Sequence, residues 1–331
     1  MSSRKASILF LSVSLLLMSA IVVFNYRVDP LCYYRCESVE AERKNLNSYY
    51  QNLQKILLFP DTELLVLGSS RGESLPLQWL SDEYALKALN LSVGGADVHA
   101  KTAFLEFALA NLKLRRVIWI ADYFEFTDAG MSEKVVLTPA LAHLASGDVP
   151  MNPGRHLQRL SKLLDHNTIE ASFALLRGKK TSSPLTRGEN SGMQIPQCET
   201  HLTELHLTSD RLAKEVNTIY DGYAHSILVP TQNAQSLAKL QRVAARLRSR
   251  GIEFTVVIPP YHPDFMRRLK TEHPDIWNRH QTWVDNLRQL RASGAAVRDF
   301  FFAEDFSQDP VRYWNDGVHF NCRAAAMMLK R

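Results

Sequence analysis

The sequence predicts an α/β protein with a three-layer α/β/α architecture: a doubly wound parallel sheet between two layers of helices, preceded by one apolar N-terminal helix. Short, continuous apolar runs recur along the chain, as expected for strands buried on both faces of a parallel sheet. Segments with helical spacing of apolar residues separate these runs, which is the pattern of βαβ units. The first run, Ala6 to Phe24, is instead long enough for a membrane helix.

The N-terminal run (6–24) contains no charged residue and no proline. Arg4 and Lys5 precede it, so the positive-inside rule places residues 1–5 in the cytoplasm and the rest of the chain beyond the membrane. A signal peptide cleaved after Ala20 is the alternative. We favour an uncleaved anchor, because the apolar run continues past that residue. The expected location is therefore the bacterial inner membrane, crossed once, with the main domain in the periplasm.

The rest of the chain is expected to form a juxtamembrane neck over residues 25–60 and one large domain over residues 61–331. An insertion is predicted at about 125–230, where the alternation of strands and helices is interrupted. Five apolar runs are predicted as the strands of the sheet: Leu64–Leu67, Ala88–Val93, Arg116–Ala121, Phe254–Ile258 and Ala295–Phe301. Helical spacing predicts helices over about 103–112, 232–250, 283–290 and 323–330.

The composition argues against several classes of function. The formal net charge is +5, and basic and acidic residues are interleaved without a dense Lys/Arg stripe. Neither an RNA-binding signature nor zinc-finger spacing occurs, so no nucleic-acid partner is expected. The cysteines and histidines do not have the spacing of a metal site, and we expect neither a metal nor a cofactor.

Four cysteines, Cys32, Cys36, Cys198 and Cys322, allow three disulfide pairings in an oxidising compartment. Cys32 and Cys36 lie just after the predicted membrane helix and could bridge each other. Cys322 could instead be a small, buried apolar side chain. The sequence does not choose between these alternatives.

Two short motifs carry the chemistry that the sequence suggests. Gly68-Ser69-Ser70-Arg71 follows the first predicted strand, and Asp316-Gly317-Val318-His319 lies near the C-terminus. A serine nucleophile needs a base to accept its proton, and that base needs a carboxylate to fix its tautomer. Taken singly, the first motif is most often a strand-to-helix turn and the second a capped loop. Their joint occurrence favours a catalytic set of Ser70, Asp316 and His319.

The chain resembles the SGNH (GDSL-like) hydrolase superfamily at four blocks: Gly68-Ser69-Ser70, Asn90 to Gly95, Pro259-Pro260 and Asp316 to His319. The resemblance covers about residues 61–331 without the insertion. Its membrane-anchored, cell-envelope members are most similar, including D-alanyl transfer proteins of teichoic-acid modification and polysaccharide O-acetyltransferases. The common family form of the first block is Gly-Asp-Ser, so the matching nucleophile is Ser70.

The resemblance also implies an oxyanion hole, which needs hydrogen-bond donors aimed at the developing charge. The backbone N–H groups of Ser70 and of Gly94 or Gly95 are the candidates, although the two glycines could simply form a turn. The family's third block is Gly-x-Asn-Asp, and its Asn side chain stabilises the oxyanion. Here Asp122 follows the third strand without an Asn, and a carboxylate does not donate unless it is protonated.

Three further residues are predicted to bind substrate: Arg71, Asp122 and His262. Arg71 could bind an anionic group or pair with Glu73. Asp122 could contact sugar hydroxyls or hold a loop. His262 follows Pro259-Pro260, where it could line the cleft or cap the next helix.

The residues and the resemblance together predict a membrane-anchored, periplasmic acyl esterase or acyltransferase. We expect it to act on a cell-envelope glycan through an acyl-serine intermediate on Ser70. Its partners would be the acylated glycan or acyl donor and, for a transferase, a membrane protein that supplies the acyl group. The alternative is a non-catalytic protein of the same fold that binds or assembles envelope polysaccharide for export. The sequence does not identify the acyl group, the glycan or the acceptor.

Overall fold

The computed structural model describes residues 3–34, 47–73, 75–127, 134–135, 138–145, 160–177, 208–302, 306 and 309–330. The chain divides into two compact units. The first combines Met1–Gln54 with Glu133–Leu185, and the second combines Lys55–Ser132 with Thr186–Arg331. The neck and insertion proposed from the sequence stay predictions.

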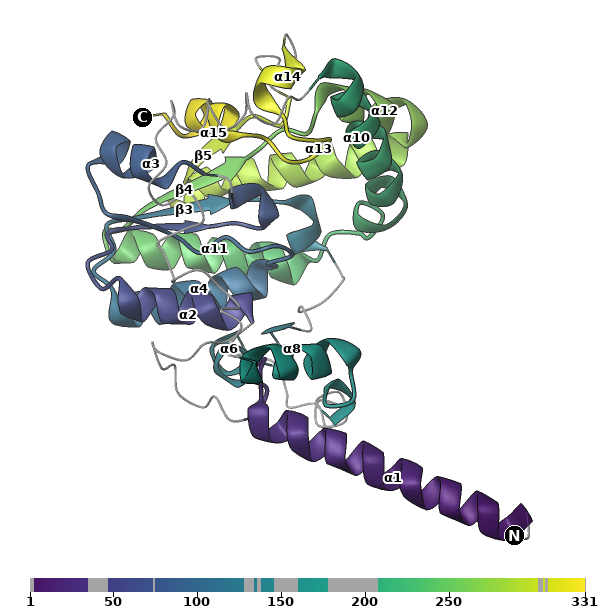
Figure 1. Ribbon diagram of the computed structural model, residues 1–331. Coiled ribbons are helices and arrows are strands. Elements are labelled where there is room, and N and C mark those ends of the chain that lie inside the picture. The colour runs from purple at the N-terminus through teal and green to yellow at the C-terminus, as the bar shows by residue number, and fades with distance from the viewer. Residues whose placement is uncertain are drawn as a thin grey trace. The chain divides into compact units, whose positions relative to one another are not determined.

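The second unit contains a five-stranded parallel sheet in the order β2-β1-β3-β4-β5 (Figure 1). The strands are β1 (Leu64–Leu67), β2 (Ala88–Asn90), β3 (Arg116–Ile120), β4 (Glu253–Ile258) and β5 (Ala296–Asp299). The order reverses direction at β1, which is the arrangement of a doubly wound sheet with its switch point between β1 and β3. The predicted α/β fold class is confirmed.

The apolar runs form strands because both faces of the sheet are covered. All four side chains of β1 are fully buried, and Val66 pairs with Asn90 on one side and Ile118 on the other. Three strands are shorter than predicted: β3 ends one residue earlier, at Ile120, and β2 and β5 differ more. β2 ends at Asn90, whose side-chain Oδ1 accepts a hydrogen bond from the Ser92 backbone N–H at 2.9 Å. β5 ends at Asp299, whose Oδ1 accepts in the same way from Phe301.

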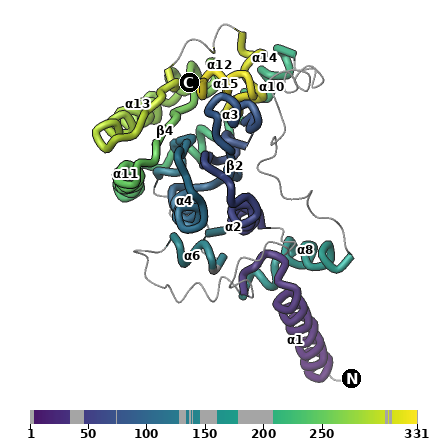
Figure 2. The backbone as a smooth tube through the Cα atoms, turned by 90° about the vertical axis from the view of Figure 1, so that its left-hand side faces the viewer, coloured from purple at the N-terminus to yellow at the C-terminus, as the bar shows by residue number. Residues whose placement is uncertain are grey.

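Helices cover the sheet on both faces. Figure 1 shows α4 and α11 on one face and α3 and α15 on the other, and Figure 2 shows the same layers from the side. The helices of this unit include α3 (Leu77–Tyr84), α4 (Val98–Asn111), α10 (Ser209–Gly222), α11 (Ala234–Ser249), α12 (Pro263–Glu272), α13 (Pro274–Arg288), α14 (Pro310–Tyr313) and α15 (Cys322–Leu329). Asp97, Asn233 and Asn321 cap the N-termini of α4, α11 and α15 with their side chains, as is typical of these residue types.

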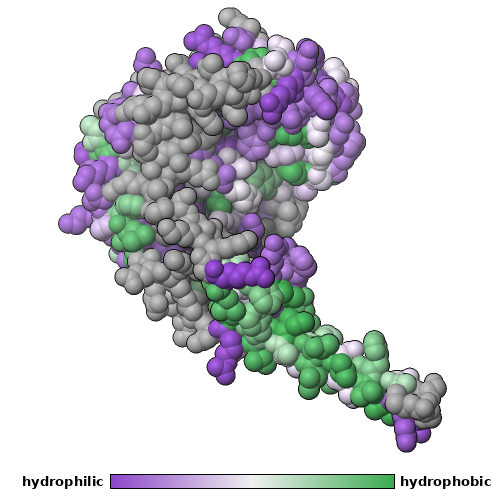
Figure 3. All heavy atoms as spheres, viewed as in Figure 1, coloured by the Kyte–Doolittle hydropathy of each residue, from purple (hydrophilic) through white to green (hydrophobic). Residues whose placement is uncertain are grey.

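The first unit contains α1 (Ser3–Val28), α6 (Pro139–Ala145) and α8 (His166–Leu176), together with most of α2 (Ser48–Leu58). Residues Arg4–Val28 of α1 have a mean hydropathy of 2.6 in their most apolar window, and none of that window is buried. Figure 3 shows the hydrophobic side chains along this helix. The helix is therefore long and apolar enough to cross a membrane.

Cys32 and Cys322 each take part in a disulfide, with partners that stay open, so Cys322 is not the free apolar side chain that was the alternative. Cys36 and Cys198 lie outside the described residues, so the pairing of the four cysteines stays open.

Candidate active site

Ser70 lies directly after the carboxyl end of β1, in the first position of a 3-10 helix, η1 (Ser70–Gly72). Two glycines allow this turn to pack against Ser92, in the loop that follows β2. A Cβ on Gly68 would come within 2.6 Å of Ser92 Oγ, and one on Gly72 within 2.3 Å of the same atom. At these distances the Ser92 side chain would have to move, so both glycines let the turn that presents Ser70 approach Ser92 closely.

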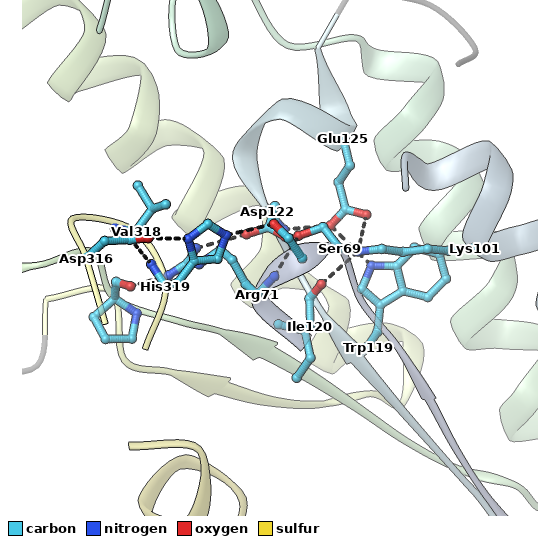
Figure 4. Close-up of polar contacts among 12 residues, drawn as sticks. Ser69, Arg71, Lys101, Trp119, Ile120, Asp122, Glu125, Asp316, Val318 and His319 are labelled. Carbon is cyan, nitrogen blue, oxygen red and sulfur yellow. Dashed lines mark hydrogen bonds and ion pairs between the residues drawn. The ribbon is translucent and has the colours of Figure 1, made fainter. Parts of the chain in front are cut away.

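Asp316 and His319 lie on the loop between α14 and α15, and they are joined by hydrogen bonds (Figure 4). Asp316 Oδ1 accepts from the backbone N–H groups of Val318 at 2.8 Å and His319 at 2.7 Å. Asp316 Oδ2 lies 2.7 Å from His319 Nδ1, and His319 Nε2 lies 2.9 Å from Ser70 Oγ. With Nδ1–H donating to the carboxylate, Nε2 is left to accept the serine proton.

The hydrogen bonds around the Asp316 carboxylate favour its ionised form. Burial raises the pKa of the Asp316 carboxyl, but the hydrogen bonds from His319 and Val318 outweigh this effect and the net pKa is lowered. The side chains of Asp316 and His319 are 19% and 31% exposed, and Ser70 is half-buried. The structure thus brings together the three residues that the sequence proposed as catalytic, and all three are partly exposed.

The predicted oxyanion donors differ in their surroundings. A Cβ on Gly94 would lie 4.0 Å from Ser70 Cβ, so this glycine flanks the serine. Its N–H, however, donates to Glu73 Oε1 at 2.6 Å. Gly95 adopts φ +72°, a backbone conformation that suits glycine and forms a turn. The carbonyl oxygen of a substrate would have to replace the Glu73 carboxylate before Gly94 could stabilise an oxyanion.

Arg71 and Asp122 form a buried ion pair beneath the serine turn, with 4% and 1% of their side chains exposed. Arg71 Nη1 lies 2.9 Å from Asp122 Oδ1, and Nη2 donates to the Pro260 carbonyl. Ser69 Oγ donates to Asp122 Oδ2, and the guanidinium lies 4.6 Å from the centre of the Tyr261 ring. The pair joins the turn after β1 to the ends of β3 and β4. Asp122 therefore holds a loop, and Arg71 pairs with it rather than with Glu73.

A second buried ion pair, between Lys101 and Glu125, is connected to Asp122 and has no sequence motif. Lys101 Nζ is 2.7 Å from Glu125 Oε2, and both side chains are fully buried. The ammonium also donates to the Ile120 carbonyl at 2.8 Å, and Glu125 Oε1 accepts from the Asp122 backbone N–H at 2.7 Å. Burial raises the pKa of Glu125 to about 7, against the opposing effect of the Lys101 charge. The sequence does not show that Lys101 is buried, because lysines in helices are usually exposed.

His262 takes the second of its two predicted roles. Its Nδ1 accepts from the Asp264 backbone N–H at 3.1 Å, which caps the N-terminus of α12. The side chain is 2% exposed, and burial lowers the pKa of His262 to about 4. Its backbone N–H donates to Gly317 at 3.0 Å, so His262 supports the loop of Asp316 and His319. The substrate-binding roles of Arg71, Asp122 and His262 stay predictions, since all three are engaged within the protein.

Tyr223 lies near the site, although no sequence motif includes it. It begins a short π-helix, η3 (Tyr223–Ile227), which continues α10, and its ring centre is 6.3 Å from that of Phe265. Burial raises the pKa of the Tyr223 hydroxyl, and the charges of Asp122, Arg71 and Asp316 also act on it. Short π-helices are frequent at functional sites, but sequence patterns do not predict them.

Among the residues that the structure describes, no group of three or more His, Cys, Asp or Glu side chains is placed to hold a metal ion.

The sequence matches no protein-family model, and no curated protein matches it. Among solved structures, the chain is similar to one from Streptococcus pneumonia that is provisionally described as a platelet activating factor. The two share 11% sequence identity, and the match covers 86% of this chain and 92% of that chain with a TM-score of 0.40. A similarity at this level assigns no function, so the site is interpreted from its own geometry.

Proposed function

We propose that this protein is a membrane-anchored serine acyl hydrolase or acyltransferase of the SGNH type. The observation that carries the proposal is the continuous hydrogen-bonded set of Ser70, His319 and Asp316, with distances of 2.9 and 2.7 Å. Such a set activates a serine as a nucleophile, because the base lies within hydrogen-bond reach and is itself oriented by a carboxylate. The four sequence blocks that resemble the SGNH superfamily support the same interpretation.

In the proposed acylation step, Ser70 Oγ attacks the carbonyl carbon of an acyl ester while His319 Nε2 takes the hydroxyl proton. The tetrahedral intermediate then breaks its bond to the leaving alcohol, which receives the proton from Nε2 and departs. Asp316 stabilises the imidazolium and fixes the ring orientation throughout. The product is an acyl group on Ser70.

In the second step, His319 Nε2 takes a proton from an acceptor hydroxyl, whose oxygen attacks the acyl carbon. The bond to Ser70 Oγ then breaks, and Nε2 returns the proton to that oxygen, which restores the free serine. Water as the acceptor makes the protein an esterase, and a sugar hydroxyl makes it a transferase. The backbone N–H of Ser70 and, once Glu73 has moved away, that of Gly94 would stabilise the oxyanion in both steps.

We further propose that α1 anchors the protein in the bacterial inner membrane with Arg4 and Lys5 in the cytoplasm. The site would then face the periplasm, where the substrate is an acylated envelope glycan. A transferase also requires a donor, which we expect to be supplied by a membrane protein that carries the acyl group. The length and hydropathy of α1, together with its uncharged segment 6–24, support the anchor.

A non-catalytic protein that binds envelope polysaccharide is the second candidate. Two observations favour it: Asp122 stands where the family pattern has an oxyanion Asn, and Glu73 accepts from the Gly94 N–H. The two candidates differ in one consequence. A binding protein does not need the Ser70 hydroxyl, whereas an enzyme does.

The test is envelope-glycan acylation in cells that carry single variants. We expect Ser70→Ala and His319→Ala to lose activity almost completely, because such a set acts as a unit. Asp316→Asn should keep a residual activity, since the histidine is then held in the wrong tautomer. Ser249→Ala, at an exposed serine on α11, is the matched control. Wild-type acylation by a folded Ser70→Ala protein would favour the binding protein.

A further inference from the structure

α8 buries polar side chains and exposes apolar ones, the reverse of what is usual for a helix on a protein surface. Its buried residues are polar: Thr168 is 3% exposed and Ser172 is 0% exposed. Its apolar side chains are instead accessible, with Phe173 46% and Leu176 64% exposed. Ile169, which is half-buried, precedes these two by four and seven positions, so the three form one stripe along the helix. A helix at a water-facing surface has the opposite distribution.

The buried polar side chains attach α8 to the end of the apolar helix α1. Asn25 is fully buried, and its Nδ2 donates to the Leu163 carbonyl at 2.6 Å. Ser172 Oγ donates to Asn25 Oδ1 at 2.8 Å. The rings of Phe24 and Phe173 also pack together, with their centres 5.1 Å apart. Figure 1 shows α8 beside the C-terminal end of α1.

The position of Asn25 defines where α8 lies along the apolar span. The span covers Arg4–Val28, so Asn25 is in its last turn, where a membrane helix leaves the hydrocarbon core. Arg177 follows the helix directly and is exposed, with its guanidinium 5.9 Å from the centre of the Phe173 ring. Arg177 thus lies at the end of the apolar stripe, where a basic side chain can extend to the lipid headgroups, and the exposed Glu170 lies beside the stripe, three residues before Phe173.

We infer that α8 is an interfacial helix that lies on the bilayer entered by α1, with Phe173 and Leu176 inserted among the lipids. Lipid is the occupant that fits best, because the hydrogen bonds of Asn25 hold this stripe at the end of the membrane span. The inference rests on the proposed membrane anchoring by α1, but not on any chemistry at Ser70. It adds a second contact with the membrane, which restricts rotation of the first unit about α1.

The inference can be tested by photo-crosslinking of the full chain in phospholipid vesicles. Benzoylphenylalanine is introduced as Leu176→benzoylphenylalanine and, as a matched control, as Asn167→benzoylphenylalanine. Asn167 is also exposed on α8 but lies about 180° around the helix from Leu176. We expect lipid adducts at position 176 in several-fold excess over position 167. Circular dichroism shows whether each variant is folded, and Phe173→benzoylphenylalanine provides a second position on the stripe.

Two outcomes would overturn the inference. Equal lipid labelling at positions 176 and 167 would show that the stripe does not enter the bilayer. A protein adduct at 173 and 176 would show that a second copy or another protein covers it instead. Carbonate extraction of the wild-type protein tests the anchoring by α1 separately, so failure of the anchor and failure of the interfacial helix are distinguishable.

Discussion

Replacing Asp122 by Asn tests whether the buried pair beneath the serine turn stabilises the fold. Asp122→Asn preserves the shape of the side chain but leaves the Arg71 charge without its counter-charge, 2.9 Å away in the wild type. Ser69 can adapt, because its hydroxyl can accept as well as donate. The lost interaction therefore affects mainly the Arg71 charge, because only 4% of this side chain is exposed to water.

Removing one partner of a buried ion pair costs about 3–5 kcal/mol in the free energy of unfolding. We expect a loss of this size for Asp122→Asn. The double variant Arg71→Met/Asp122→Asn should lose less than the sum of the two single variants, by about 0.5–3 kcal/mol, because the second substitution removes the unpaired charge. Lys87→Met is the control, since Lys87 and Asp61 form a pair at 2.8 Å whose side chains are 63% and 45% exposed. Such exposed pairs contribute about 0–1 kcal/mol.

The assay is equilibrium urea unfolding in detergent, followed by the fluorescence of the buried tryptophans Trp119, Trp283 and Trp314 of the second unit. The midpoint of Asp122→Asn should shift to clearly lower urea than that of Lys87→Met. If Asp122→Asn unfolds at the wild-type midpoint, or if the two single losses simply add in the double variant, the pair does not stabilise the fold in the way described.

Two further predictions concern the surroundings of the site. Because burial lowers the pKa of His262 to about 4, its contribution to stability is fully present above about pH 6.5 and is lost as the pH falls from 6.5 to 4. His262→Asn keeps a helix-capping side chain and should reduce the pH dependence of the unfolding free energy by up to about 1.4 kcal/mol per pH unit. The measurement is urea unfolding between pH 7.5 and 5. An unchanged dependence of the unfolding free energy on pH would contradict this prediction. Glu73→Ala should release the Gly94 N–H and raise the rate of hydrolysis of a neutral acetyl ester, whereas a lower rate in a folded variant would show that Glu73 assists the reaction instead.

The sequence predicted the parts of the fold that depend on continuous burial. Leu64–Leu67 was placed correctly because a strand covered on both faces is apolar at every position. The ends of β2 and β5 were predicted too late, since Asn90 and Asp299 terminate the strands through local side-chain hydrogen bonds. A run of apolar residues does not by itself show where such a strand ends.

The candidate site was predictable where its residues are close in sequence or follow from the topology. Asp316 and His319 are three residues apart, and Ser70 follows the strand at the switch point of the sheet, where ligands bind in doubly wound folds. The pairs Arg71–Asp122 and Lys101–Glu125 join segments that are distant in sequence and share no periodic pattern. No pattern in the sequence therefore predicts either ion pair, and the substrate-binding roles of Arg71 and Asp122 stay predictions.

Labelling with a fluorophosphonate, followed by peptide mass spectrometry, tests the central claim most directly, because the reagent reacts with a serine only when a neighbouring base activates it. We expect one covalent adduct in the wild-type protein, on Ser70, with none in Ser70→Ala and far less in His319→Ala. Ser69, the adjacent serine, should stay unmodified, since its buried hydroxyl donates to Asp122. A folded wild-type protein that takes up no label, or takes it up on a serine other than Ser70, would contradict the assignment of Ser70 as the nucleophile.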